Sequence, residues 1–381
     1  MTARRLRPFG TTIFTEMSAL AARTGALNLG QGFPDGDGPE EVMEAVATAM
    51  RSGFNQYAPL AGVPELRAAI ADHQRRRYGI ELDPDDGIQV TFGATEAIAA
   101  TMLGLLEPGD AVGMLEPYYD SYAATIAIAG GQRRLVTLRP PGFALDLDEL
   151  AAAARGARML LLNSPHNPTG RVLARAELEA IAAICVEHDL IAVTDEVYEH
   201  LVFDGEHVPL ATLPGMAQRT LTISSAGKSF SFTGWKIGWC SGPPELVAGV
   251  RAAKQFLSFA GGTPLQHAVA AALADAERHV APLCASLRAN RDRLCAGLAA
   301  VGFDVSVPQG TYFVNADAAP LGVEDAARWC RELPARAGVV AIPTSAFYDD
   351  AQAGRTLVRF AFCKRAAVIE EAVRRLSAPH G

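Results

Sequence analysis

The stretch RTLTISSAGKSFSFTGWKIGWCSG, residues 219–242, decides how the rest of the chain is interpreted. An apolar strand pattern at 221–223 runs into a small, hydroxyl-rich turn that holds Lys228, and a second cation, Lys236, follows. Lysine is scarce, occurring only at positions 228, 236, 254 and 364, and arginine supplies the other positive charges. Arginine cannot replace an amine nucleophile, because a guanidinium does not lose its proton. The turn therefore indicates a functional amine, although taken alone it also suits a solvated loop lysine.

The bulk composition describes a well-cored globular protein. Its 381 residues are 49% hydrophobic and 20% charged, which predicts one large domain and a smaller one. The net charge of -8 argues against binding to nucleic acid or to an anionic membrane. No apolar run reaches the length of a membrane span, and residues 1–14 lack the apolar core of a signal peptide. Six cysteines without any CxxC spacing predict reduced thiols in a cytoplasmic protein.

Apolar strand patterns alternate with helical patterns from about residue 88. The expected strands are 88–92, 111–116, 133–138, 157–163, 190–194, 220–224 and 237–241. This alternation predicts an α/β fold with a mostly parallel sheet and helices on both of its faces. Ligands of such sheets bind at the carboxyl ends of the strands, and the polar motifs of this chain fall at those ends.

The flanking regions complete the predicted organisation. Helical patterns cover 11–25, 40–52 and 65–78, and helices continue from Pro264 to about residue 300. Short strands (303–307, 311–315, 339–342, 356–362) then alternate with helices at 323–333 and 365–376, which predicts a smaller α+β domain. We divide the chain into an N-terminal segment (1–40) that packs with the small domain, a large domain (41–280) and a small C-terminal domain (281–381).

Two strand ends carry side chains that suit a ring-shaped ligand. Asp195 closes an apolar strand, where a carboxylate is costly unless it is paired, and a cationic ring nitrogen would pair it. Tyr198 follows three residues later and directs a hydroxyl to the same region. Asn167 lies between Pro165 and Pro168, so its loop is stiff. Each feature also has a plain structural explanation, a turn cap for Asp195 and a proline-rich turn for Asn167.

Two further strand ends suit a phosphate and an aromatic ring. Gly93, Ala94 and Thr95 begin a helix directly after a strand, and the amides of a helix N-terminus bind phosphate. Tyr119 follows Pro117 and offers a flat surface or core packing. Together the strand ends ask for an aromatic aldehyde with a ring nitrogen, a phenolic oxygen and a phosphate, which describes pyridoxal 5'-phosphate.

Seven motifs carry a resemblance to a known family over nearly the whole chain. They are LNLGQGFPD (27–35), NQY (55–57), NSPHNPTG (163–170), TDEVYEHLVFD (194–204), SSAGKSFSFTGWKIGW (224–239), PQGTYF (308–313) and LVRFAFCK (357–364). In combination they resemble the class I aminotransferases of fold type I. The resemblance implies a mostly parallel seven-stranded sheet in an α/β/α sandwich, a smaller α+β domain and pyridoxal 5'-phosphate as cofactor.

The resemblance also implies roles for individual residues. Lys228 matches the lysine that holds the cofactor covalently and moves the proton, and Asp195 matches the carboxylate paired with the pyridine nitrogen. Tyr198 and Asn167 match the hydrogen-bond partners of the phenolic oxygen. The remaining cofactor contacts match the phosphate site and the stacked aromatic ring: Gly93, Ala94, Thr95, Ser225 and Lys236 at the phosphate, and Tyr119 on the ring.

Three more matches concern the substrate and the partner subunit. Arg359 matches the arginine that binds the α-carboxylate of the substrate through paired hydrogen bonds, with Gly32 and Asn167 beside it. Its apolar neighbours make a surface position for Arg359 a poor explanation. Tyr57 matches a tyrosine that reaches the phosphate of the neighbouring subunit, so the resemblance implies a homodimer with the active site at the interface.

One sequence difference from the glutamine-preferring relatives narrows the expected substrate. Glutamine-preferring relatives carry an aromatic residue and a histidine where this chain has Ala260, Gly261, Gly262 and Thr263, which suits a longer or bulkier substrate. Within the branch of kynurenine, glutamine and methionine aminotransferases, the motifs most resemble actinobacterial N-succinyldiaminopimelate aminotransferases. We therefore expect a ping-pong aminotransferase of diaminopimelate and lysine biosynthesis, with 2-oxoglutarate as the second partner.

Other functions also have to be considered, both within the pyridoxal 5'-phosphate enzymes and outside them. A β-lyase of cysteine conjugates would use the same Lys228 and Asp195, so the sequence leaves it open beside kynurenine, glutamine and methionine transamination. Ser225 and Lys228 fit the S-x-x-K of serine acyltransferases, but the companion S-D-N and K-T-G elements are absent from the sequence. A regulator that only binds the cofactor would need an added DNA-binding module. Four histidines show no ligand spacing (His166, His188, His200 and His207), so no metal is expected.

Overall fold

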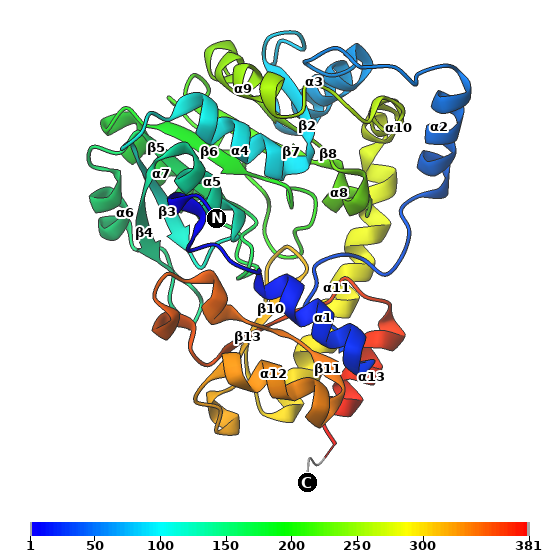
Figure 1. The fold of residues 1–381 in the computed structure, drawn as a ribbon, viewed down its shortest axis with the longest axis vertical. Coiled ribbons are helices and arrows are strands. Elements are labelled where there is room, and N and C mark those ends of the chain that lie inside the picture. The colour runs from blue at the N-terminus through cyan, green and yellow to red at the C-terminus, as the bar shows by residue number, and fades with distance from the viewer. Residues whose placement is uncertain (1, 379–381) are drawn as a thin grey trace.

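The computed structural model describes residues 2–378 and contains a seven-stranded main sheet (Figure 1). Its strand order is β2-β8-β7-β6-β5-β3-β4. The strands are β2 (Ile88–Phe92), β3 (Ala111–Glu116), β4 (Gln132–Thr137), β5 (Met159–Asn163), β6 (Ile191–Asp195), β7 (Thr220–Ser225) and β8 (Ile237–Ser241). Only β8 runs antiparallel to its neighbours, because the short connection from β7 has no room for a full crossover helix. The predicted mostly parallel sheet is confirmed.

Both faces of the main sheet are covered, as the unbroken apolar pattern of β5 requires. Met159 and Leu161 of β5 pack into one apolar cluster, and Leu160 and Leu162 pack into another on the opposite face. The first face carries α4 (Gly93–Leu105), α5 (Ser121–Ala129) and α9 (Pro244–Leu257). The second face carries α6 (Leu147–Ala154) and α7 (Arg175–Glu187). The sheet is therefore the middle layer of an α/β/α sandwich.

A third apolar cluster extends the second face at the β2 edge of the sheet. Val90 of β2 and Trp239 of β8 contact helices there. These helices are α2 (Glu40–Arg51), α3 (Pro64–Tyr78) and α10 (Thr263–Ala274). They place residues 40–80 and 263–274 beside each other, although the two segments lie far apart in the sequence.

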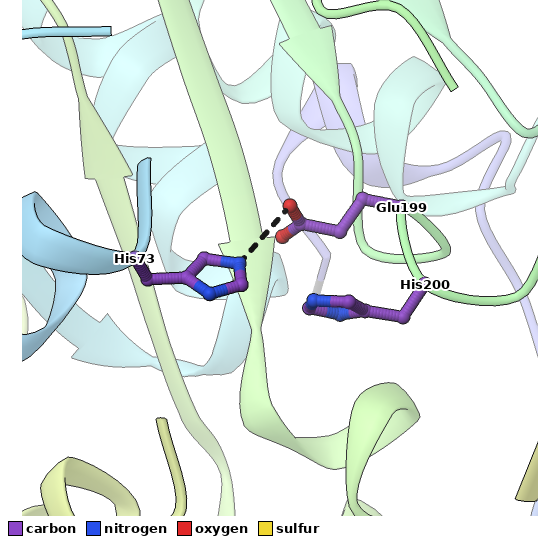
Figure 2. Close-up of side chains that lie close together, drawn as sticks. All are labelled: His73, Glu199 and His200. Atoms are coloured by element: carbon purple, nitrogen blue, oxygen red, sulfur yellow. Dashed lines mark ion pairs between the residues drawn. The ribbon is translucent and has the colours of Figure 1, made fainter. Parts of the chain in front are cut away.

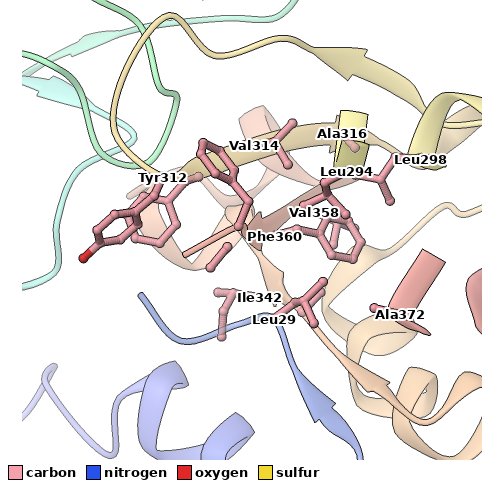
Figure 3. Close-up of a cluster of buried hydrophobic side chains, with 14 of the residues drawn as sticks. Leu29, Leu294, Leu298, Tyr312, Val314, Ala316, Ile342, Val358, Phe360 and Ala372 are labelled. Atoms are coloured by element: carbon pink, nitrogen blue, oxygen red, sulfur yellow. The ribbon is translucent and has the colours of Figure 1, made fainter. Parts of the chain in front are cut away.

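A smaller sheet forms the second body of the molecule, in the order β12-β13-β10-β9. Its strands are β9 (Asp304–Ser306), β10 (Phe313–Asp317), β12 (Ile342–Pro343) and β13 (Leu357–Ala361). The helices around it are α11 (Ala276–Val301), α12 (Ala326–Ala337) and α13 (Ala366–Leu376). Val314, Phe360 and Leu294 belong to its apolar core (Figure 3). The predicted α+β arrangement of this region is present.

The N-terminal segment lies against this second body. β1 (Leu27–Asn28) pairs in parallel with β11 (Val339–Val340), and α1 (Ile13–Thr24) lies beside α12 (Figure 1). Leu29 reaches the same core as Phe360 (Figure 3). The continuous helix α11 passes through the proposed boundary at 280/281, and the three-part domain division stays a prediction.

Within residues 2–378, the sequence interpretation leaves out the helices α6 and α9, as well as the four-residue helix α8 (Ala226–Ser229). The side chain of Asp146 caps α6 by accepting hydrogen bonds from the amides of Asp148 and Glu149. Helix α9 has Pro244 at its first position, where the missing amide proton is no loss. Throughout residues 2–378, every helix is too short or too polar to span a bilayer.

Candidate active site

Three parallel strands end at the same edge of the main sheet and bring the predicted residues together. Asn163, the last residue of β5, is in register with Asp195, the last residue of β6. Beside them, β7 ends at Ser225 and continues into the short helix α8 (Ala226–Ser229), which carries Lys228. A pocket lies at this edge. Its lining includes ten predicted residues: Gly93, Ala94, Thr95, Tyr119, Asn167, Asp195, Tyr198, Ser225, Lys228 and Lys236.

Lys228 is held at the centre of this pocket by a hydroxyl. Its Nζ donates to the hydroxyl of Tyr312 over 2.8 Å, and that hydroxyl donates to the carbonyl oxygen of Gly32 over 2.6 Å. Burial lowers the pKa of Lys228 to about 8, because the charged ammonium loses its hydration. A substantial fraction of the amine is therefore unprotonated slightly above neutral pH.

Asp195 is a buried carboxylate, 4% exposed, with its oxygens fixed by two donors. The hydroxyl of Tyr122 donates to Oδ2 over 2.6 Å, and the amide of Val197 donates to Oδ1 over 3.3 Å. Burial raises the pKa of Asp195 to about 6, while the Tyr122 hydrogen bond opposes this rise. A cationic partner would stabilise the ionised form, so the carboxylate suits a protonated ring nitrogen.

Asn163 links Asp195 to the predicted Asn167. Its side-chain nitrogen donates to the backbone oxygen of Asp195 over 2.7 Å, and its Oδ1 accepts from the amide of Asn167 over 2.7 Å. Tyr198 is buried three residues beyond Asp195, with its ring edge-on to that of Tyr312 at 5.2 Å. The amide and the phenol therefore have fixed positions beside the same pocket.

The opposite end of the pocket suits an anion. Helix α4 begins at Gly93, and the Nζ of Lys236 donates to the Thr95 hydroxyl over 3.4 Å. Glycine is required at two positions here. Gly93 has φ of 66°, and a Cβ on Gly238 of β8 would lie 2.5 Å from the Gly93 carbonyl carbon. Because this turn lies close to β8, the first amides of α4 and the Lys236 ammonium lie near each other, as a phosphate site requires.

Arg359 lies outside the pocket lining but contacts one of its residues. The guanidinium donates from Nη1 to Asn167 Oδ1 over 3.1 Å and from Nη2 to the Gly30 carbonyl oxygen over 3.0 Å. Its Nε has no hydrogen-bond partner among the described residues, and the side chain is 1% exposed. Burial lowers the pKa of Arg359 to about 10. A buried cation with an unused donor suits a substrate carboxylate.

Two other predicted residues lie apart from the pocket. Gly32 contributes only its carbonyl oxygen, which accepts from Tyr312. Tyr57 is 82% exposed in the connection between α2 and α3, and its ring meets that of Phe259 edge-on at 5.8 Å. Within one copy of the chain, Tyr57 is therefore not part of the pocket.

The sequence interpretation misses three residues of the site: Tyr312, Tyr122 and Asn163. Tyr312 belongs to PQGTYF, which supports the family resemblance without giving the tyrosine a role. Tyr122 is on α5 and carries no local signal that it reaches Asp195. Asn163 ends a predicted strand, so its position alone is a usable signal.

The residues of the pocket fit pyridoxal 5'-phosphate. The amine matches the aldehyde of that group, and the buried carboxylate matches its ring nitrogen. The amide and the phenol match the phenolic oxygen, and the helix N-terminus with its lysine matches the phosphate. Gly93 and Gly238 carry no side chain, so neither residue covers this proposed anion site.

Comparisons with known proteins agree with this chemistry. A sequence profile described as "Aminotransferase class I and II" matches residues 24–376. A Mycobacterium tuberculosis protein described as probable N-succinyldiaminopimelate aminotransferase DapC is 56% identical, covering 99% of this chain and 98% of the relative. The methionine aminotransferase of Escherichia coli is 39% identical, covering 98% of this chain and 97% of that protein.

A solved structure gives the same result at the level of the fold. The structure of N-succinyldiaminopimelate aminotransferase from Mycobacterium tuberculosis superposes with a TM-score of 0.97, covering 99% of each chain. The fold-type I architecture predicted from the sequence is confirmed. The chain belongs to the class I and II aminotransferases, and it is a pyridoxal 5'-phosphate-dependent enzyme that moves an amino group between an amino acid and a 2-oxo acid.

Proposed function

We propose that this aminotransferase acts on N-succinyl-LL-diaminopimelate and 2-oxoglutarate by a ping-pong mechanism, in the biosynthesis of diaminopimelate and lysine. The observation that carries the proposal is 56% identity to a probable N-succinyldiaminopimelate aminotransferase over 99% of the chain. The sequence at Ala260, Gly261 and Gly262, which differs from the aromatic residue and histidine of glutamine-preferring relatives, also argues against glutamine as the substrate.

The residue roles follow from the chemistry of the pocket. When bound, pyridoxal 5'-phosphate supplies an electron sink for negative charge at the substrate Cα. Lys228 holds the cofactor and moves the proton, since its lowered pKa leaves free amine near neutral pH. Asp195, oriented by Tyr122, would pair with the ring nitrogen, and Tyr198 and Asn167 would bind the phenolic oxygen.

The other residues bind and orient. The amides of Gly93, Ala94 and Thr95, with Ser225 and Lys236, would hold the phosphate, and Tyr119 would contact the ring. Arg359, held by hydrogen bonds to Asn167 and the Gly30 carbonyl, would bind the α-carboxylate of the substrate, and the Gly32 carbonyl beside it accepts from Tyr312. Tyr312 orients the Lys228 amine.

We further propose a homodimer in which Tyr57 reaches the phosphate of the neighbouring subunit. Support comes from exposed apolar side chains in the same region: Met50, Phe54, Tyr57, Phe256, Leu257 and Phe259. Tyr57 and Phe259 are in ring contact, so two of these segments form one surface. A cytoplasmic location stays a proposal, supported by six cysteines that are present as free thiols.

The test follows the cofactor absorbance of the purified holoenzyme during half-reactions. We expect N-succinyl-LL-diaminopimelate to convert the bound cofactor to its amine form with a second-order rate constant at least about tenfold above those of kynurenine, methionine and glutamine. A 2-oxo acid should restore the starting spectrum, and Lys228→Ala should show no conversion. A faster reaction with methionine or kynurenine would contradict the substrate. Release of pyruvate from a cysteine conjugate without any 2-oxo acid would identify a β-lyase instead.

A further inference from the structure

Three buried side chains converge behind the cofactor pocket: His73 of α3, and Glu199 and His200 in the turn after β6 (Figure 2). One ligand atom from each lies within 4.8 Å of the others. The Nε2 of His73 is 3.7 Å from Glu199 Oε2. The three residues are 4%, 1% and 5% exposed. This His73–Glu199–His200 cluster has no part in the aminotransferase chemistry described above.

The cluster contains two polar atoms that are not satisfied. The Nε2 atoms of His73 and of His200 are buried and have no hydrogen-bond partner among the described residues. Leaving a buried polar group unpaired costs about 1–3 kcal/mol, and here two such groups lie beside one carboxylate. A single group that accepts both nitrogen lone pairs and the carboxylate charge would satisfy all three residues.

Surrounding hydroxyls already orient two of the three side chains. The Nδ1 of His200 is 2.7 Å from the Ser229 hydroxyl, which leaves Nε2 as its free nitrogen. Ser224 donates to Glu199 Oε1 over 2.6 Å, and Tyr78 donates to Oε2 over 2.8 Å. A carboxylate has about four lone-pair sites, so these two bonds leave Glu199 free to coordinate a cation. Outer contacts of this kind orient the ligands of protein metal sites.

We propose that His73 Nε2, His200 Nε2 and the Glu199 carboxylate bind one Zn²⁺ ion. Two imidazoles and one carboxylate form an established zinc donor set, and the fourth position is then open to water. Zinc binds neutral imidazole and ionised carboxylate.

A cleft borders two of the three side chains, Glu199 and His200, while His73 lies behind its lining. Tyr78 also lines the cleft, and its volume is about 550 Å³. That volume far exceeds the roughly 10–15 Å³ that one water molecule requires. Arg77 also lines the cleft, but its guanidinium is paired with Glu277 at 3.2 Å, which offsets its repulsion of a cation.

The position of the cluster suggests what the ion does. Ser229, which contacts His200, directly follows Lys228, and Glu199 directly follows Tyr198. His73 adds α3, so the ion would join three segments behind the cofactor pocket. We infer a stabilising site, because the three side chains of the cluster are not among the residues that line the cofactor pocket.

Metal content of the tag-free holoenzyme tests the proposal directly. After dialysis against zinc and then against buffer, we expect about one Zn²⁺ per chain by mass spectrometry. Co²⁺ in place of zinc should give the visible absorption bands of a four-coordinate site. His73→Gln and Glu199→Gln should abolish this binding. Ser229→Ala should weaken it by about 10- to 100-fold, because that change removes only the orienting contact.

A matched control separates this site from general histidine binding. His188 follows the last residue of α7, away from the cluster, so His188→Gln should keep the full zinc content. Circular dichroism shows whether each variant folds. If the ligand variants do not fold, the wild-type stoichiometry and cobalt spectrum alone decide the matter. Zinc below about 0.1 per chain in the wild type, or equal zinc in folded His73→Gln, would overturn the proposal.

Discussion

Arg359 is surrounded by aromatic rings rather than by carboxylates. Its guanidinium carbon lies 4.0 Å from the ring centre of Phe313, 4.8 Å from that of Phe347 and 5.2 Å from that of Phe14. Ring faces attract the cation but do not accept its N–H groups as a carboxylate does. The rings thus hold the Arg359 side chain in place, and its N–H groups remain available to a carboxylate of the substrate.

Replacing the Arg359 guanidinium by the ammonium of a lysine should weaken substrate binding without changing the bound cofactor. A hydrogen bond to a charged group contributes about 1.5–3 kcal/mol, so Arg359→Lys should lower kcat/KM for the amino acid by about 10- to 150-fold. Steady-state kinetics would measure the change, and the cofactor spectrum should be unaltered. The exposed Arg355 offers the control Arg355→Lys, which should leave kcat/KM unchanged. Equal losses in the two variants would exclude a specific role for Arg359.

The lowered pKa of Lys228 predicts how the apoenzyme takes up its cofactor. With a pKa of about 8, the unprotonated amine rises from about one tenth at pH 7 to about nine tenths at pH 9. Only that form is nucleophilic, so the rate of cofactor uptake should rise about tenfold over this range. Stopped-flow absorbance at a fixed cofactor concentration would measure it. A rate that is flat from pH 7 to 9 would mean that the Lys228 amine does not control uptake.

At the scale of elements, the phosphate end of the site depends on how α4 packs against α9. A Cβ on Gly104 of α4 would lie 2.2 Å from the carbonyl oxygen of Gly249 in α9. The two helix backbones are therefore in direct contact. This contact fixes α4, whose first residues are the proposed phosphate ligands.

Inserting one methyl group at this contact should force the two helices apart. We expect Gly104→Ala to lower the free energy of unfolding by about 1–3 kcal/mol, as overpacking does in other cores. Urea denaturation of the holoenzyme would measure this loss. Gly36 is the matched control, because a Cβ there meets nothing within 4 Å, and Gly36→Ala should change stability by less than about 0.5 kcal/mol. Equal stability of the two variants would show that α4 and α9 can separate freely.

At the scale of the whole molecule, the position of Arg359, the proposed substrate-binding arginine, depends on segments from both ends of the chain. Phe14 belongs to α1, Phe313 to β10 and Phe347 to the short helical turn after β12, while Gly30 follows β1. All four surround a guanidinium on β13, and Asn167 joins it to the main sheet. The proposed substrate site therefore lies where the two bodies of the molecule meet.

The proposed dimer predicts that two variants, each inactive or impaired alone, form one intact active site when they share a dimer. Lys228→Ala removes the amine, and Tyr57→Phe removes the hydroxyl offered to the neighbour. In a mixed dimer, the subunit that keeps Lys228 receives an intact Tyr57 from its partner. Subunit exchange should therefore raise activity several-fold above the average of the two separate variants. Sedimentation would establish the dimer, and an unchanged average activity after exchange would place Tyr57 outside the neighbour's site.

The local pattern of the chain is enough to predict the main sheet and its ligand edge. Apolar runs such as 157–163 can be satisfied only between two covered faces, and parallel strands put Asn163 and Asp195 at one edge. Lysine occurs at only four positions, and the hydroxyl-rich turn after an apolar strand distinguishes Lys228 among them. These features depend on composition and on neighbours in the sequence, so the sequence suffices to predict them.

Only the tertiary structure decided which distant side chains meet. Tyr122 reaches Asp195, Tyr312 holds Lys228, and His73 joins Glu199 and His200. The sequence predicts helices at α3 and α5, but not which element each helix meets or which polar atom lies opposite. Such partners arise from packing between segments far apart in the chain. The sequence therefore determined the fold and the main chemical groups, whereas the packing determined the orientation, the pKa and the partners of each group.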